Sequence, residues 1–107
     1  MTSSYRKYGN RKVWLDNILF QSVHEADRYK ELIMLQSAGL ITELELQPRF
    51  KIVIEGQKIC TYIADFRYLS TETGQRITED AKGYPTPEYK IKKKLVRALY
   101  GIEVIEV

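Results

Sequence analysis

The sequence predicts a single α/β domain in which a short hairpin precedes a core of order α-β-β-β-α-β, with a central mixed sheet flanked by two helices. Two segments carry helix-start and helix-stop residues, and the runs between them are rich in strand-forming residues separated by turns. The chain has 107 residues, enough for one domain with one modest core. Residues 1–10 are polar and are expected to be loosely ordered.

The first elements are a hairpin and a helix. Asp16-Asn17 is typical of a two-residue turn between Lys12–Leu15 and Ile18–Phe20. Ser22-Val-His-Glu25 then forms a capping box, and the helix is expected to run from about Ser22 to Ala38, before Gly39.

Glu25 falls inside the apolar stripe of this helix. At 100° per residue it shares one arc with Ala26, Tyr29, Leu32 and Ile33. One interpretation is a capping carboxylate that folds back on the Ser22 amide, and the other is an acid that points inward at the mouth of a site. Both can hold for the first turn of a helix.

Three strand runs follow, separated by turns at residues 55–57 and 71–74. The first joins Thr42–Leu46 to Arg49–Ile54 through Pro48, and the next two are Lys58–Leu69 and Gln75–Lys82. If the last two runs turn symmetrically about Glu72-Thr73, paired residue numbers sum to 145 and Asp65 lies opposite Asp80.

Asp65 and Asp80 are the strongest candidates for chemistry. Like charges directly across a strand pair repel, and a divalent cation between them would reverse that interaction. Lys82 points to the same side as Asp80, where it could orient or deprotonate an attacking water, or simply form a salt bridge. The alternative is a register slip that leaves both acids solvated on an edge.

The second helix is expected from Thr86-Pro87 to about Tyr100, with Gly101 as its stop and Ile102–Val107 as the last strand. Its expected apolar face comprises Ile91, Leu95, Ala98 and Leu99. A basic stripe follows i, i+3, i+4, i+7 and comprises Lys90, Lys93, Lys94 and Arg97. The stripe has no matching i+4 acids, so it is either a solvated face or a surface for a polyanion, where Tyr89 could stack on bases or merely pack.

The composition argues against several classes of protein. The single cysteine, Cys60, excludes an intrachain disulfide, no apolar run approaches a membrane span, and no apolar leader is visible, so a cytoplasmic protein is expected. The only histidine, His24, falls off the apolar arc and has no nucleophile to pair with, and no glycine-rich phosphate loop is present.

Together, Glu25, Asp65 and Asp80-Ala-Lys82 resemble the PD-(D/E)XK nuclease superfamily, whose restriction-endonuclease-like core has the same α-β-β-β-α-β order. More closely, the chain resembles a family of small phage-associated proteins. The matching stretches are 7–13, 20–29, 46–50, 62–66, 79–83 and 89–95. Ala64 stands where the superfamily has proline, and Asp80 is one methylene shorter than glutamate.

The resemblance implies a metal-dependent endonuclease acting on DNA, in the cytoplasm of a phage-infected or prophage-carrying bacterium. Asp65, Asp80, the Ala81 carbonyl and Glu25 would bind Mg²⁺ or Mn²⁺, and Lys82 would assist the attacking water. The basic stripe and Tyr89 would bind DNA, and a homodimer or partner subunit is expected because the chain is small. The competing hypothesis is a DNA-binding or assembly subunit whose acids are structural, and cleavage of RNA is a third.

Overall fold

The computed structural model describes residues 11–81 and 85–107, so Lys82 and residues 1–10 lie outside the described residues. The elements are β1 (Val13–Leu15), β2 (Ile18–Phe20), α1 (Val23–Ser37), β3 (Ile41–Leu46), β4 (Arg49–Ile54), β5 (Gln57–Ile63), β6 (Phe66–Ser70), β7 (Arg76–Asp80), α2 (Pro87–Tyr100) and β8 (Val104–Glu106). No helix in this part of the chain is long and apolar enough to cross a membrane.

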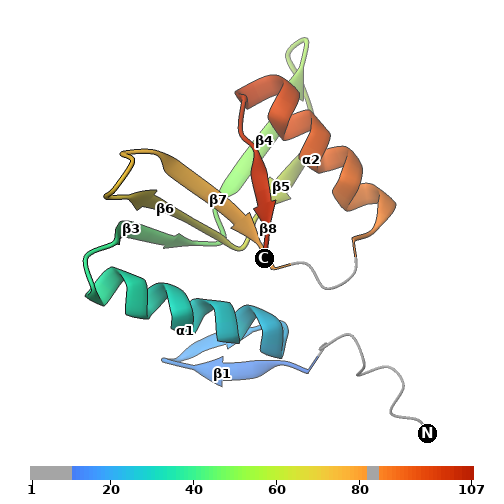
Figure 1. The fold of residues 1–107 in the computed structure, drawn as a ribbon. Coiled ribbons are helices and arrows are strands. Elements are labelled where there is room, and N and C mark those ends of the chain that lie inside the picture. Colours follow the sequence, from blue (N-terminus) through green and yellow to red (C-terminus); the bar gives the residue numbers. More distant parts are fainter. Residues whose placement is uncertain (1–10, 82–84) are drawn as a thin grey trace, which may run out of the picture.

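A mixed sheet with the strand order β3-β6-β7-β8 forms the centre of the molecule. The β3–β6 and β6–β7 pairs are antiparallel, and β8 runs parallel to β7. Helix α1 lies below this sheet and α2 lies on the other side (Figure 1). The predicted α/β class, with a mixed sheet and two flanking helices, is therefore confirmed.

The two long strand runs are each broken, which corrects the prediction of continuous strands. The breaks lie side by side, where the Gln47 amide donates to the Asp65 carbonyl at 2.9 Å and the Ala64 amide donates to the Pro48 carbonyl at 3.1 Å. Gln47 has a positive φ of 53°. Beyond this bend β4 and β5 leave the central sheet and form a separate two-stranded ribbon (Figure 1).

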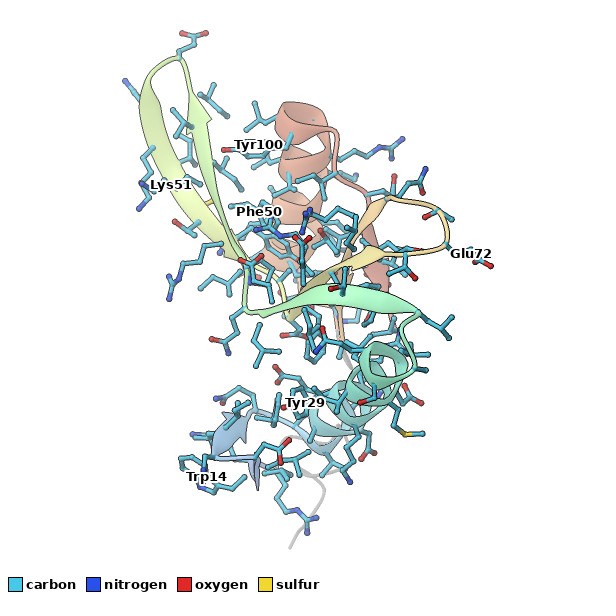
Figure 2. All side chains as sticks on the ribbon, turned by 90° about the vertical axis from the view of Figure 1, so that its left-hand side faces the viewer. Trp14, Tyr29, Phe50, Lys51, Glu72 and Tyr100 are labelled. Atoms are coloured by element: carbon cyan, nitrogen blue, oxygen red, sulfur yellow. The ribbon has the colours of Figure 1, made fainter. Side chains whose placement is uncertain are left out.

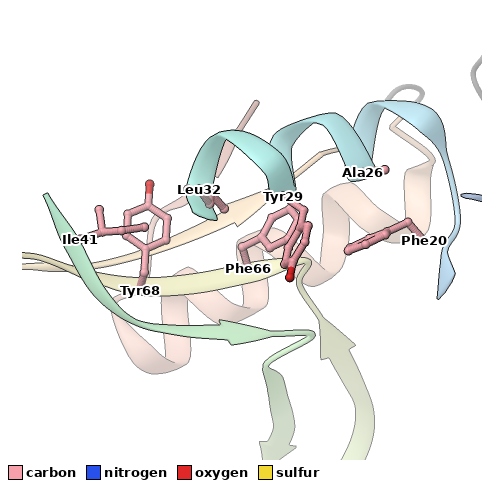
Figure 3. Close-up of a cluster of buried hydrophobic side chains, with 7 residues drawn as sticks. All are labelled: Phe20, Ala26, Tyr29, Leu32, Ile41, Phe66 and Tyr68. Carbon is pink, nitrogen blue, oxygen red and sulfur yellow. The ribbon is translucent and has the colours of Figure 1, made fainter. Parts of the chain in front are cut away.

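Two clusters of buried side chains hold the layers together. The first packs α1 against β3 and β6 and comprises Phe20, Ala26, Tyr29, Leu32, Ile41, Phe66 and Tyr68 (Figure 3). The second packs α2 against the ribbon and β8 and comprises Phe50, Ile52, Tyr62, Ala64, Tyr89, Val96 and Val104. Strand β7 runs between both layers, which explains why Thr78, Glu79 and Asp80 are all buried.

The hairpin turn and the helix caps lie where the sequence predicts them. Asp16 and Asn17 both have positive φ in the β1–β2 turn, as a two-residue hairpin requires. The Ser22 and Thr86 hydroxyls cap α1 and α2, and Gly101 ends α2 in the left-handed conformation at φ 69°.

The predicted apolar face of α2 is wrong except at Leu95, which is half-buried and packs against the second cluster. Ile91 is 58% exposed and Leu99 is 43% exposed, whereas Tyr89 and Val96 are buried. The helix carries apolar residues on two sides, and packing on the ribbon selects the side that bears the larger Tyr89 ring. The stripe on α1 is as predicted, with Glu25, Ala26, Tyr29 and Leu32 buried.

Candidate functional site

The end of the β6–β7 pair brings Asp65 close to the backbone that follows Asp80. Pairing from Phe66↔Glu79 to Leu69↔Arg76 has the predicted sum of 145, so that register is confirmed. The regular ladder ends at Phe66, one residue short of Asp65. The Asp65 amide donates to the Glu79 carbonyl at 3.1 Å. The Asp65 carboxylate then accepts from the Ala81 amide at 2.7 Å, and so occupies the place of a backbone carbonyl at the end of β7.

Asp80 is fully buried at 0% exposure, and its Oδ2 accepts a hydrogen bond from the Tyr62 hydroxyl. Burial, followed by this hydrogen bond, raises the pKa of Tyr62, so the hydroxyl stays a donor at neutral pH. The negative charge of Asp65 also contributes to that rise. Tyr62 was missed from the sequence, although it lies three residues before Asp65 on a strand that leads into the site.

Glu25 and Asp65 line the same cavity, of about 240 Å³, between β2 and the bend at Gln47. The Glu25 amide donates to the Ser22 hydroxyl at 3.1 Å, which confirms the cap. Its carboxylate accepts from the Gln21 amide at 3.1 Å, and not from the Ser22 amide as predicted. Glu25 therefore caps the helix and also lies beside the cavity that Asp65 reaches.

Tyr89 joins this region to the last strand. Its hydroxyl donates to Glu106 at 2.8 Å, and its ring centroid lies 6.2 Å from that of Tyr62. Burial and this hydrogen bond raise the pKa of Tyr89, and the charges of Asp80 and Asp65 add to the rise. The same hydrogen bond lowers the pKa of Glu106, with help from Lys93. Tyr89 is thus a packed, hydrogen-bonded residue, whereas the sequence left stacking on bases open.

The predicted basic stripe of α2 lines a groove against β8. All four cations of the stripe border this cavity of about 310 Å³, together with Glu103 and Glu106. Lys93 lies 3.3 Å from Glu106, and Arg97 lies 3.6 Å from Glu103. The helix offers no i+4 acids to the stripe, as predicted, but acids on β8 and just before it pair with these two residues.

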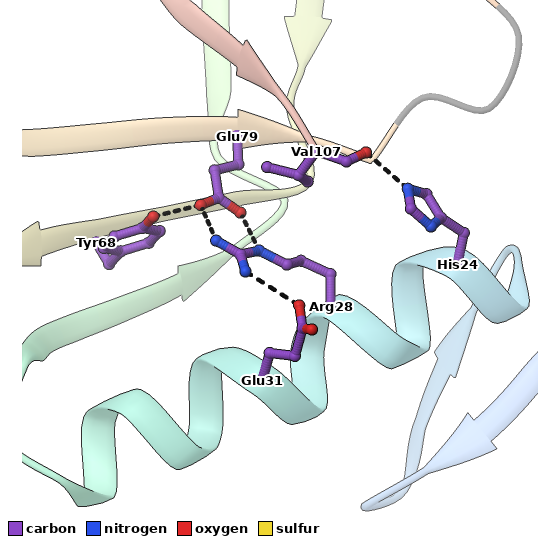
Figure 4. Close-up of polar contacts among 6 residues, drawn as sticks. All are labelled: His24, Arg28, Glu31, Tyr68, Glu79 and Val107. Atoms are coloured by element: carbon purple, nitrogen blue, oxygen red, sulfur yellow. Dashed lines mark hydrogen bonds and ion pairs between the residues drawn. The ribbon is translucent and has the colours of Figure 1, made fainter.

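A buried ion pair beneath the sheet was also missed. Arg28 donates through Nε and Nη2 to the two carboxylate oxygens of Glu79, at 2.8 and 2.6 Å, and Tyr68 donates to the same carboxylate (Figure 4). The hydrogen bond to Glu79 raises the pKa of Arg28, and burial is the main cause that raises the pKa of Tyr68 to about 12. The need for a partner becomes evident only in the structure, where β7 is covered on both faces and a buried acid must be paired.

The other sequence candidates are less informative. His24 is exposed, as predicted, and its Nε2 lies 2.6 Å from the Val107 carbonyl oxygen (Figure 4). Lys82 belongs to the undescribed residues, so its predicted role stays a prediction. Within residues 11–81 and 85–107, no group of three or more His, Cys, Asp or Glu side chains gathers as a metal site.

The donors at the end of β7 fit a hard cation with few protein ligands. Mg²⁺ is commonly held by one or two carboxylates, and water and substrate phosphate complete its coordination. Asp65 and Asp80 flank the Ala81 amide, and each uses one carboxylate oxygen in the hydrogen bonds above. The residues present therefore suit an ion held by two carboxylates better than one held by three.

The comparisons with known proteins give one family. The family described as "Protein of unknown function (DUF1064)" matches residues 5–104. Neither the curated proteins nor the solved structures gave a match. Because the match covers nearly the whole chain, the protein belongs to this DUF1064 family.

Proposed function

We propose that this protein is a metal-dependent endonuclease that hydrolyses DNA phosphodiester bonds. The observation that carries the proposal is the meeting of Asp65 and Asp80 at the end of β7, with Tyr62 and the Ala81 amide holding one oxygen of each. Two acids at the end of one strand pair repel each other, and a divalent cation bound by both would offset that repulsion. The element order of the central sheet adds support.

That order becomes α-β-β-β-α-β when the β4–β5 ribbon is treated as an insertion between β3 and β6. It is the order expected for a restriction-endonuclease-like core. In such a core, the first helix supplies an acid near the two strand acids, and Glu25 shares a cavity with Asp65 here.

In this proposal Asp65, Asp80 and the Ala81 carbonyl hold Mg²⁺ or Mn²⁺, and Glu25 binds through water. The ion would polarise the phosphate and lower the pKa of bound water. Tyr62 keeps Asp80 oriented by donating to Oδ2, and Lys82 assists the water. Lys90, Lys94 and the paired Lys93 and Arg97 supply positive potential toward DNA.

The second candidate is a DNA-binding or assembly subunit without catalysis. Its supporting observation is that the described residues gather no third metal-ligating carboxylate around Asp65 and Asp80. Such a subunit, acting as a homodimer or with a partner subunit, should bind DNA equally well after the charge of Asp65 or of Asp80 is removed.

A cleavage assay with matched variants separates the two. Supercoiled plasmid, branched DNA and RNA are incubated with the protein and Mg²⁺ or Mn²⁺, beside Asp80→Asn, Asp65→Asn and Asp27→Asn. Asp27 is exposed on the outer side of α1 and serves as the control for loss of one carboxylate. The asparagine at 80 keeps an acceptor for Tyr62, so the fold should persist while activity falls at least 100-fold.

Cleavage that survives in Asp80→Asn would come from a contaminant and would refute the catalytic assignment. Absence of cleavage of every substrate by the wild type, with DNA binding intact, would favour the binding subunit. Cleavage of RNA without cleavage of DNA would show that the substrate is RNA and not DNA.

A further inference from the structure

The outer face of the β4–β5 ribbon carries three cations and no acid of its own, although Glu88 of α2 lines a pocket beside Thr61 and Ile63 at its edge. Strand alternation and the Phe50↔Tyr62 pair place the buried aromatic residues on the inner face, toward α2. The paired outer positions are therefore Arg49↔Ile63, Lys51↔Thr61 and Val53↔Lys58. This outer face, which holds three cations, is hereafter the ribbon face.

None of Arg49, Lys51 and Lys58 takes part in an ion pair among the described residues. All three are exposed, and the single acid of the ribbon, Glu55, lies in its end turn. The cations of α2 differ, since Lys93 and Arg97 already face Glu106 and Glu103. Cations gathered on one face repel one another, and an anionic partner would relieve that repulsion.

Apolar side chains are interleaved with these cations. Ile63 is 42% exposed and Val53 is 40% exposed, and both share the ribbon face with the cations. Ile59, the extra residue at the bulge between Ile52 and Val53, is also exposed. Branched side chains of this kind also favour the strand conformation, and on this face a duplex would offer them sugars and groove walls, together with phosphates for the cations.

The ribbon face also stands next to the candidate site. Arg49 follows directly after the bend, and its partner Ile63 precedes Ala64 and Asp65. Figure 2 shows Lys51 projecting from the ribbon on the side away from α2 and Tyr100, and Trp14 of β1 on the same side at the other end of the molecule. The cavity lined by β2, Gln47, Glu25 and Asp65 lies between β1–β2 and the bend where the ribbon begins.

We propose that the ribbon face is the docking surface for duplex DNA, with Arg49, Lys51 and Lys58 on the phosphates. This deepens, and rests on, the proposed action on DNA. A two-stranded ribbon is one of the elements that duplex DNA accommodates. Docking here leads the DNA backbone past the cavity that holds Glu25 and Asp65, whereas the α2 groove lies on the opposite side of the ribbon.

The test compares two double variants that remove equal charge. Binding of a fluorescein-labelled 20-base-pair duplex is measured between 50 and 200 mM NaCl, without divalent metal, for wild type, Arg49→Ala/Lys51→Ala and Lys90→Ala/Lys94→Ala. Each lost phosphate contact reduces the slope of log K against log salt by about 0.9. The slope for the ribbon variant should therefore be about 1.8 shallower than that for wild type. Raising the salt from 50 to 200 mM should then weaken DNA binding by the ribbon variant about 12-fold less than it weakens binding by wild type.

The ribbon variant should also bind more weakly than wild type at 50 mM. The α2 variant, whose cations add positive potential without direct phosphate contacts in this proposal, should lose less affinity and less slope than the ribbon variant. Thermal unfolding of both variants should match wild type, because the four side chains are exposed and outside ion pairs. A ribbon variant with the wild-type slope, or a larger effect in the α2 variant, would overturn the proposal. So would a ribbon variant that dissociates a dimer in sedimentation while DNA binding is unchanged.

This test of DNA binding is independent of the proposed catalysis, because the binding assay contains no divalent metal. Ribbon-dependent binding by a protein that cuts nothing would support this surface and refute the endonuclease. Normal Asp80-dependent cleavage with ribbon-independent binding would overturn this surface alone.

Discussion

Replacing Arg28 by alanine should destabilise the protein strongly, although the residue contributes no apolar side chain to the core. Arg28 forms two hydrogen bonds with Glu79, and its side chain is 22% exposed while that of Glu79 is 2% exposed. Among the described residues, the substitution leaves the buried Glu79 carboxylate with the Tyr68 hydroxyl as its one remaining side-chain hydrogen-bond donor.

The magnitude follows from the burial of the pair. Removing one partner of a buried ion pair typically costs about 3–5 kcal/mol, and the partial exposure of Arg28 places this case near 3 kcal/mol. An unfolding entropy of about 2.1 cal/mol/K per residue gives about 0.22 kcal/mol/K for 107 residues. The expected fall in Tm is therefore about 13 °C.

Calorimetry and urea unfolding measure the effect, with Arg76→Ala as the matched control. Arg76 is 45% exposed and pairs at 3.0 Å with the exposed Glu43, so its loss should cost at most about 1 kcal/mol, or about 4 °C. Arg28→Met combined with Glu79→Gln should recover more than half of the loss, because no unpaired charge remains and Gln still accepts from Tyr68. Equal, small shifts for Arg28→Ala and Arg76→Ala would refute the reasoning.

Three further outcomes are expected. Gly101→Ala should lower the free energy of unfolding by about 1 kcal/mol in urea titration, since alanine is strained at φ 69°. Ser22→Ala should lower it by a similar amount of about 1 kcal/mol, through loss of the cap to the Glu25 amide, and should reduce helical circular dichroism first at high temperature. The pKa of Tyr68 rises from about 10 unfolded to about 12 folded, so its contribution is complete below pH 10 and is lost as the pH approaches 12. Tyr68→Phe should thus flatten the loss of stability between these pH values, as measured by unfolding at each pH; an unchanged pH profile would count against this.

The parts of the fold that local chemistry determines were predictable from the sequence. The turn at Asp16-Asn17, the Ser22 cap and the stop at Gly101 depend on the conformational preferences of a few residues. The β6–β7 register followed from one turn and strand alternation, and was confirmed over its regular part. These signals need no knowledge of distant contacts.

The remaining features depend on contacts between segments far apart in sequence. Helix α2 has apolar residues on two sides, and only the packing of Phe50 beside Tyr100 and Tyr62 decides which side is covered. The acids that pair with Lys93 and Arg97 come from β8 and its approach, which periodicity on the helix cannot reveal. The pairing of Arg28 with Glu79 spans 51 positions and has no local signature.

The broken strand is the departure that matters most for the site. In an unbroken strand from β5 into β6, Asp65 would use its backbone in the ladder and its side chain would stand perpendicular to the sheet. At the bend, its amide bonds to Glu79 and its carbonyl accepts from Gln47, which leaves the carboxylate to accept from the Ala81 amide. Failures of local sequence reasoning are expected at functional or strained positions. The bend that the sequence did not predict is therefore the feature that brings the Asp65 carboxylate to the end of β7, beside Asp80.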